Sequence, residues 1–329
     1  MRIGNVTIRS EPALALAPMA GYTDVAYREL IARNGADIVY TELISATAIA
    51  RQGIGFSKGG RITKTAQIIR VGEGGISAIQ LFGANPADIS AAVRIIGENV
   101  ESGECGARLI DLNFGCPAKK VVKTGAGSRL LERPKNATKI VEAAAKYSPL
   151  PVTVKMRLGD KDGKNVEMAR ALEAAGVQAL AVHGRTARQK FGGKADWEAI
   201  GEVVRAVSVP VFGNGDVCAP PDVKRICEVS GCAGVMAGRA VLADPLFFRH
   251  AREYLADGKW KETGWEEKVG FLGEYGRLSR EYDIPFNAAK GLALQLACGF
   301  RDSARVREKI TRSQDETQLM SAMGTKQDG

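Results

Sequence analysis

The sequence predicts an α/β protein: a (β/α)8 TIM barrel over residues 1–245, followed by a smaller helical domain over residues 246–329. Three observations lead to this fold class: eight short apolar runs, helix-like stretches between them, and a change of pattern after Pro245. The 329 residues are 45% hydrophobic and 25% charged, which is an ordinary globular composition. The chain is therefore long enough for one large domain and a smaller one.

The eight apolar runs are rich in Val, Ile, Leu and Ala, and we expect them to be strands. They lie at residues 13–17, 38–41, 76–81, 109–113, 152–155, 179–183, 209–213 and 234–237. The runs are continuous rather than alternating, as in a parallel sheet that is covered on both faces. Eight strand and helix units in about 240 residues match the usual size of a TIM barrel.

Apolar residues at three- and four-residue spacing predict helices between the strands, for example at residues 86–99, 137–147, 166–175 and 197–207. A doubly wound sheet would also alternate strand and helix. It should then carry a GxGxxG turn after its first strand, but here that strand leads into PMAGYTD. The barrel is therefore favoured.

After Pro245 helical spacing continues without a strand pattern, at residues 247–255, 265–282, 286–299 and 303–310. This change predicts a separate helical domain. The last dozen residues are polar, and we expect them to be frayed because they have little to bury.

Charge and cysteine usage indicate which partners to expect. Lys and Arg number 46 against 37 Asp and Glu, and the net charge of +9 makes a polyanionic partner plausible. The start MRIGNVTIRS lacks the apolar core of a signal peptide, and no stretch approaches the roughly 20 apolar residues of a membrane span. Six cysteines occur without a CxxC pair. We expect a cytoplasmic protein with no membrane contact, no metal and no obligatory protein partner.

Polar residues close nearly every predicted strand, at the end where a TIM barrel forms its active site. The first strand ends at Pro18 and Met19, and the others end at polar residues: Thr41, Glu42, Gln80, Asn113, Lys155, Arg157, His183, Arg185, Asn214, Asp216 and Arg239. Singly, each could be a loop cap, a surface charge or a satisfied core histidine. Their convergence on one face favours a functional site.

Glycines follow the seventh and eighth strands, where this fold commonly binds a phosphate through backbone N–H groups. They are Gly213, Gly215 and Gly238, and Arg239 would add a bidentate charge partner. Together they indicate a phosphorylated cofactor.

Eight segments resemble those of the tRNA-dihydrouridine synthase family, in the family's order. They are LAPMAGYTDVAYR (16–28), TELIS (41–45), QLFG (80–83), IDLNFGCPAKKVVKTGAGSRLL (110–131), VKMRLG (154–159), VHGRT (182–186), GNGDV (213–217) and MAGRA (236–240). The run DLNFGCPAKK is the most specific of them. The resemblance implies an FMN-bearing barrel with a helical tRNA-binding domain behind it, and NADPH, or NADH, as the reductant.

The resemblance also implies roles for single residues. Pro18, Met19 and Ala20 would pack beside the flavin ring, and Gln80 and Lys155 would bind its polar edge. Asn214, Gly215, Asp216, Gly238 and Arg239 would hold the ribityl chain and phosphate. His183 would line the cofactor site, Asn113 would lie near flavin or uracil, and Cys116 would be the catalytic proton donor.

The chemistry explains why a thiol would be needed. Hydride addition at C6 of uracil leaves enolate charge that a proton at C5 resolves, so an acid is required there. Free thiols are mostly protonated at neutral pH and suit this step. Lys119 and Lys120, if close, would favour the thiolate instead. Alternatively they face tRNA phosphate.

Basic residues of the tail suggest where tRNA would bind. Six Lys and Arg stand against two Asp and Glu between residues 287 and 312, although residues 250–329 hold thirteen of each sign. We therefore expect a footprint along one face of the barrel and onto the last helices only. Expected substrate contacts are Asn113, Lys119, Arg185, Lys290, Arg301 and Arg305.

Two other functions remain open from the sequence. One is an FMN barrel acting on a free pyrimidine, similar to the dihydroorotate dehydrogenases, although such an enzyme needs no basic helical domain. The other is a tRNA-binding protein without turnover. The presence of Cys116, Lys155 and the glycines of the phosphate site argues against the latter.

Overall fold

A computed structural model of the chain describes residues 1–55, 63–159, 164–300 and 302–324. Eight parallel strands close into a barrel, because β11 pairs with β3 and β4 pairs with β6. These strands are β3 (Ala13–Leu16), β4 (Ile38–Tyr40), β6 (Ile76–Phe82), β7 (Leu109–Phe114), β8 (Val152–Leu158), β9 (Ala179–Thr186), β10 (Val211–Asn214) and β11 (Gly234–Ala237). Each overlaps one predicted strand, so the predicted fold class is confirmed.

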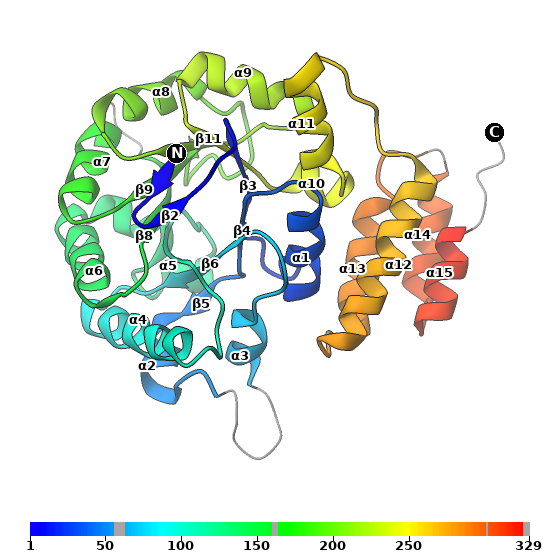
Figure 1. Ribbon diagram of the computed structural model, residues 1–329, viewed down its shortest axis with the longest axis horizontal. Coiled ribbons are helices and arrows are strands. Elements are labelled where there is room, and N and C mark those ends of the chain that lie inside the picture. The colour runs from blue at the N-terminus through cyan, green and yellow to red at the C-terminus, as the bar shows by residue number, and fades with distance from the viewer. Residues whose placement is uncertain (56–62, 160–163, 301, 325–329) are drawn as a thin grey trace.

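Helices surround the barrel, as Figure 1 shows. They are α1 (Val25–Arg33), α2 (Ala46–Gln52), α3 (Lys64–Ile69), α4 (Pro86–Glu101), α5 (Lys119–Val122), α6 (Pro134–Tyr147), α7 (Lys164–Ala174), α8 (Trp197–Ala206), α9 (Pro220–Ser230), α10 (Arg239–Ala243) and α11 (Phe247–Asp257), with the 3-10 turn η1 (Gly127–Glu132). Capping residues determine where several of these helices begin. Asn85, for example, accepts a hydrogen bond from the Ala87 N–H and caps α4, whose first residue is Pro86.

A short hairpin, β1 (Arg2–Ile3) and β2 (Val6–Thr7), closes the amino end of the barrel. Ile3, Val6 and Ile8 pack there in one apolar cluster with inward-facing strand residues such as Phe212 and Met236. The sequence analysis missed this hairpin and the short β5 (Ile44–Ser45), because two-residue strands leave no periodic pattern. With the amino end filled, the carboxyl end is where a site can open.

The helices α12 (Trp265–Glu281), α13 (Phe286–Leu296), α14 (Ser303–Arg312) and α15 (Glu316–Gly324) stand beside the barrel (Figure 1). The expectation of a frayed end from residue 318 is wrong over α15. Leu319 and Met323 are buried there, and the Trp265 indole N–H donates to the Met323 carbonyl at 2.8 Å. Residues 325–329 lie outside the described residues.

The helical region joins the barrel along α1. The Tyr275 hydroxyl donates to Asp24 Oδ2 at 2.7 Å, and the Gln295 side-chain amide donates to the Tyr22 hydroxyl at 3.1 Å. Burial raises the pKa of Asp24. Tyr22 follows β3, so this seam lies close to the carboxyl end of the barrel. The boundary after residue 245 stays a prediction, and α11 packs against α9.

In the described part of the chain, no helix combines the length and the apolar character of a membrane span.

Candidate active site

A cavity of about 550 Å³ opens at the carboxyl end of the strands, within the usual size range of small-molecule sites. Every residue predicted to bind the cofactor lies in its wall: Pro18, Met19, Ala20, Gln80, Lys155, His183, Asn214, Gly215, Asp216, Gly238 and Arg239. Asn113 and Cys116 line it as well. The structure thus brings the predicted residues together, while their individual roles stay predictions.

Cys116 is held in the cavity wall through its backbone. Its N–H donates to Asn113 Oδ1 at 2.8 Å, and its carbonyl accepts from the Ser128 N–H at 3.0 Å. The preceding carbonyl, of Gly115, accepts from Arg157 Nε at 3.0 Å. Gly127 has φ +64°, and a Cβ there would come within 2.5 Å of the Cys116 carbonyl oxygen. The KTGAGS segment therefore supplies a close backbone support for the thiol.

Gln80 and Asn113 form a hydrogen-bonded pair beneath the thiol. Asn113 Nδ2 donates to Gln80 Oε1 at 2.9 Å, and Gln80 Nε2 donates to Asp111 Oδ2 at 2.7 Å. Their amide groups are thus fixed by other protein groups before any ligand binds.

Lys155 places a cation inside the barrel mouth. Its ammonium donates to Asn214 Oδ1 at 3.0 Å, and Asn214 Nδ2 donates in turn to the Met236 carbonyl at 2.7 Å. Burial, with the charge of Arg157, lowers the pKa of Lys155 to about 8, so the side chain is still mostly charged at neutral pH.

His183 is buried beside these cations. Burial and the charges of four neighbouring side chains, Lys155, Arg157, Arg185 and Arg239, lower its pKa to about 2. The ring is therefore neutral throughout the working range of an enzyme. It packs on Gly215, whose φ of +109° and tight contact with the ring leave no room for a side chain. A neutral histidine can offer a hydrogen bond here but not a positive charge.

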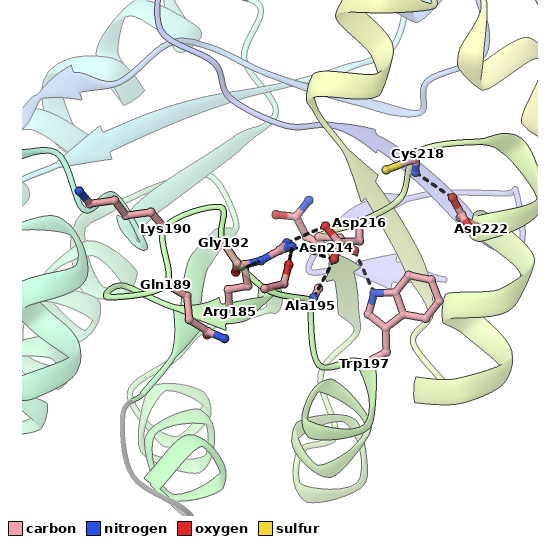
Figure 2. A network of polar contacts seen from close by, with 12 residues as sticks. Arg185, Gln189, Lys190, Gly192, Ala195, Trp197, Asn214, Asp216, Cys218 and Asp222 are labelled. Atoms are coloured by element: carbon pink, nitrogen blue, oxygen red, sulfur yellow. Dashed lines mark hydrogen bonds and ion pairs between the residues drawn. The ribbon is translucent and has the colours of Figure 1, made fainter.

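An ion pair between the buried Arg185 and the half-buried Asp216 fixes the loop that follows β9, as Figure 2 shows. Arg185 meets Asp216 with both terminal nitrogens, at 2.7 and 2.8 Å, and its Nε donates to the Gly192 carbonyl at 3.0 Å. Asp216 also accepts from the Ala195 N–H at 2.7 Å. Arg185 was expected to contact the substrate and Asp216 the cofactor. In the structure the two side chains bind each other and fix this loop.

Arg157, which the sequence placed at a strand end, and Phe191, one of the aromatic residues expected to stack on the target base, both line the cavity. Arg157 also donates to the carbonyls of Thr186 and Lys190, at 3.1 and 2.8 Å. Phe191 is 57% exposed, and the Arg239 guanidinium lies 4.3 Å from its ring centre. The strand-end position of Arg157 was a signal for the site without a particular role, and stacking of Phe191 on a base stays a prediction.

The residues expected to contact tRNA are spread more widely. Lys119 starts α5 and is exposed near Cys116, and Arg305 is exposed on α14. Lys290 donates to the carbonyls of Thr311 and Ser313, both at 2.8 Å, and so supports the carboxyl end of α14. Arg301 lies outside the described residues.

The fold and the cavity define a TIM-barrel protein with a small-molecule site of cationic and hydrogen-bonding groups. Among the residues that the structure describes, no group of three or more His, Cys, Asp or Glu side chains could hold a metal ion. The family model described as Dihydrouridine synthase (Dus) matches residues 15–326. The chain therefore belongs to the dihydrouridine synthase family, and the resemblance predicted from the motifs is confirmed.

Related proteins carry the same family name. The chain is 38% identical to tRNA-dihydrouridine synthase B of Vibrio parahaemolyticus over 287 residues, which are 86% of this chain and 84% of that protein. It is 38% identical to tRNA-dihydrouridine synthase B of Pseudomonas aeruginosa over 261 residues, or 79% and 74% of the two chains.

Among solved structures, a 2-naphthoyl-CoA reductase complex is similar with a TM-score of 0.53 and 15% identity. The match covers 79% of this chain and 52% of that chain, so this protein spans about half of it. This likeness shows the fold alone.

Proposed function

We propose that this protein reduces the C5=C6 bond of a uridine in tRNA to dihydrouridine, with FMN as bound cofactor and NADPH or NADH as reductant, in the cytoplasm. One observation carries the proposal: a thiol, Cys116, whose backbone is fixed on both sides, shares one cavity with the half-buried cation of Lys155. Family membership and the similarly named relatives support the choice of substrate.

The residues of the cavity fit a flavin phosphate. Its described charged groups are the cations Lys155, Arg157 and Arg239 and the carboxylate of Asp216, which is already paired with Arg185. The surplus positive charge suits an anionic ligand. Gln80 and Asn113 add amide groups for its polar edge, and Ala17, Met19 and Met236 add apolar surface. When bound, the flavin would supply the hydride that adds to C6 of uracil.

The protein's own groups would manage the charge and the proton. Lys155 would stabilise negative charge at the polar edge of the cofactor. The Cys116 thiol would deliver its proton to C5 of uracil as charge develops there. Lys155 and Arg157 line the same cavity as Cys116, so cationic groups surround the reacting base while the proton is transferred.

The tRNA would reach the cavity with its target uridine turned out of its stacked position, as enzymes that act on bases generally require. Tyr22, Phe114 and Phe191 are the aromatic residues that the sequence offers for stacking on this base. Phe191 stands exposed at the cavity and could do so, whereas Phe114 is buried in the core. Lys119 on α5 and Arg305 on α14 are exposed cations and would contact phosphates. Asn113 would face the uracil.

The test is quantification of dihydrouridine by mass spectrometry in unmodified tRNA incubated with the purified flavin-loaded protein and NADPH. We expect dihydrouridine in tRNA and no reduction of free uracil or oxidation of dihydroorotate. Turnover of the free pyrimidine with none in tRNA would instead support an enzyme similar to the dihydroorotate dehydrogenases. Binding of tRNA without flavin or product would support a tRNA-binding protein without turnover.

A further inference from the structure

The carboxylate of Asp111 lies beneath the cavity and is not used in the mechanism above. Asp111 is fully buried in β7. Its Oδ2 accepts from Gln80 Nε2 at 2.7 Å, and its Oδ1 accepts from the Thr153 hydroxyl at 2.6 Å. Burial raises the pKa of Asp111 to about 6, so the group is mainly ionised at neutral pH. An ionised carboxylate can only accept hydrogen bonds.

A directed chain of hydrogen bonds runs from this carboxylate to the thiol. Gln80 donates to Asp111 and accepts from Asn113, whose Nδ2 lies 2.9 Å from Gln80 Oε1. Asn113 Oδ1 accepts from the backbone N–H groups of Cys116, at 2.8 Å, and Gly115, at 3.2 Å. Each amide along the chain therefore has its nitrogen toward Asp111 and its oxygen toward Cys116.

Both ends of this hydrogen-bond chain require this orientation of the two amides. Side-chain amides can in principle be turned either way, and their partners decide between the two arrangements. At one end the Asp111 carboxylate offers only acceptors, and at the other end the backbone of Cys116 offers only a donor. Because both ends of the hydrogen-bond chain favour the same orientation, Gln80 and Asn113 each keep a second N–H that has no hydrogen-bond partner among the residues that the structure describes. Both residues line that cavity.

We propose that Asp111 is a positioning residue: it sets the direction of the Gln80 and Asn113 amides, which hold the Cys116 loop and present donors to carbonyl oxygens of a ligand. Flavin and uracil both carry such oxygens, so the inference rests on the proposed function. Without an acceptor at position 111, the Gln80 N–H would be buried without a partner, and the amide would leave its place beneath Asn113.

Substitution of Thr153 tests whether the direction of the hydrogen bonds matters, and not only the presence of a polar group at position 111. A hydroxyl can donate or accept, so in Asp111→Asn the new amide can turn its nitrogen to Thr153 and keep its oxygen on Gln80. In Thr153→Val the carboxylate still accepts from Gln80. Combining the two changes removes the acceptor for the nitrogen of the introduced amide, so the oxygen of that amide is no longer held toward Gln80.

The experiment compares Asp111→Ala, Asp111→Asn, Thr153→Val and the Asp111→Asn/Thr153→Val pair as flavin-loaded proteins. We expect each of the single variants Asp111→Asn and Thr153→Val to stay within ~3-fold of the wild-type kcat, while Asp111→Ala and the pair lose ~10-fold or more. The KM for tRNA should not change. Alkylation of Cys116 by iodoacetamide, followed by peptide mass, should change in rate in the same two variants.

Three results would overturn the inference: wild-type kcat in Asp111→Ala, a pair whose loss is only the product of the two single losses, or an unaltered rate of Cys116 alkylation. If Asp111→Ala does not fold, the other three variants still decide the matter. The alkylation rate needs no tRNA turnover, so failure of the proposed function would show as absent dihydrouridine in every protein with the alkylation pattern intact.

Discussion

The barrel mouth and the helical region use their polar side chains in different ways. At the mouth, Gln80, Asp111 and Arg185 are buried and bonded to partners on other strands and loops. In the helical region, the described ion pairs of α12 to α15 join exposed side chains, within one helix for Arg277 with Glu281 at 3.3 Å and between two helices for Arg280 with Glu316. Exposed pairs contribute little to stability. The mouth is therefore built for fixed geometry, whereas the helical surface offers mainly an electrostatic field.

This difference predicts which measurements should respond to substitution in each region. Changes at the mouth should alter rate constants and leave tRNA affinity nearly unchanged. Changes on α14 should alter affinity and its salt dependence and leave the chemical step unchanged. The seam along α1 should affect stability alone.

Apart from Cys116, the largest effect is expected at Lys155. In Lys155→Gln, which keeps a hydrogen-bonding group but no charge, reduction of the flavin by NADPH should slow by ~100-fold, because a fixed cation in the cavity wall is lost. In the wild type this rate should fall as the pH rises through about 8, where Lys155 loses its proton. Lys155→Arg should move that fall to higher pH. Stopped-flow absorbance of the flavin measures both.

Lys119→Gln is the matched control, since Lys119 is an exposed lysine near the same loop. The flavin bound to Lys119→Gln should be reduced by NADPH at the wild-type rate. Reduction of Lys155→Gln at the wild-type rate would remove Lys155 from the cofactor site and weaken the contrast between the two regions.

A smaller effect is expected on α14. Arg305→Glu should weaken tRNA binding by ~3- to 10-fold and lower the slope of log Kd against log salt by about one to two, since one phosphate contact is reversed. Turnover at saturating tRNA should not change. Filter binding over a salt series checks this, with Arg277→Glu on α12 as control. Equal effects of the two reversals would mean that α14 has no particular place in tRNA binding.

The smallest effect is expected at the seam. Tyr275→Phe removes the hydroxyl that donates to Asp24 and should lower the free energy of unfolding by ~1 kcal/mol. Thermal melting of the loaded protein should show a decrease of a few degrees, with kcat and tRNA affinity retained. A large loss of turnover in this variant would instead show that the seam controls the active site.

Much of the barrel could be predicted from the sequence because its signals are local. Continuous apolar runs mark buried parallel strands, and the polar residue that ends each run comes to lie at the same barrel mouth. The hairpin at the amino end and the burial of α15 were not predicted, because both depend on partners such as Phe212 and Trp265 far along the chain.

The hydrogen bonds within the site could not be predicted, because they also join residues that lie far apart in the sequence. Asp111 belongs to a motif that was recognised, but its partners Gln80 and Thr153 are 31 and 42 residues away in sequence. The sequence also suggested a tRNA contact for Lys290. Its engagement with the carbonyls of Thr311 and Ser313 depends on how α13 and α14 pack, which no local pattern encodes.

The most direct test of the central claim compares the wild type with Cys116→Ala in a single turnover. Both proteins are loaded with FMN, reduced by NADPH and mixed with unmodified tRNA, and dihydrouridine is counted by mass spectrometry. We predict equal reduction by NADPH and at least ~100-fold slower formation of dihydrouridine in the variant. Equal dihydrouridine formation by both proteins would contradict the assignment of Cys116 as the acid.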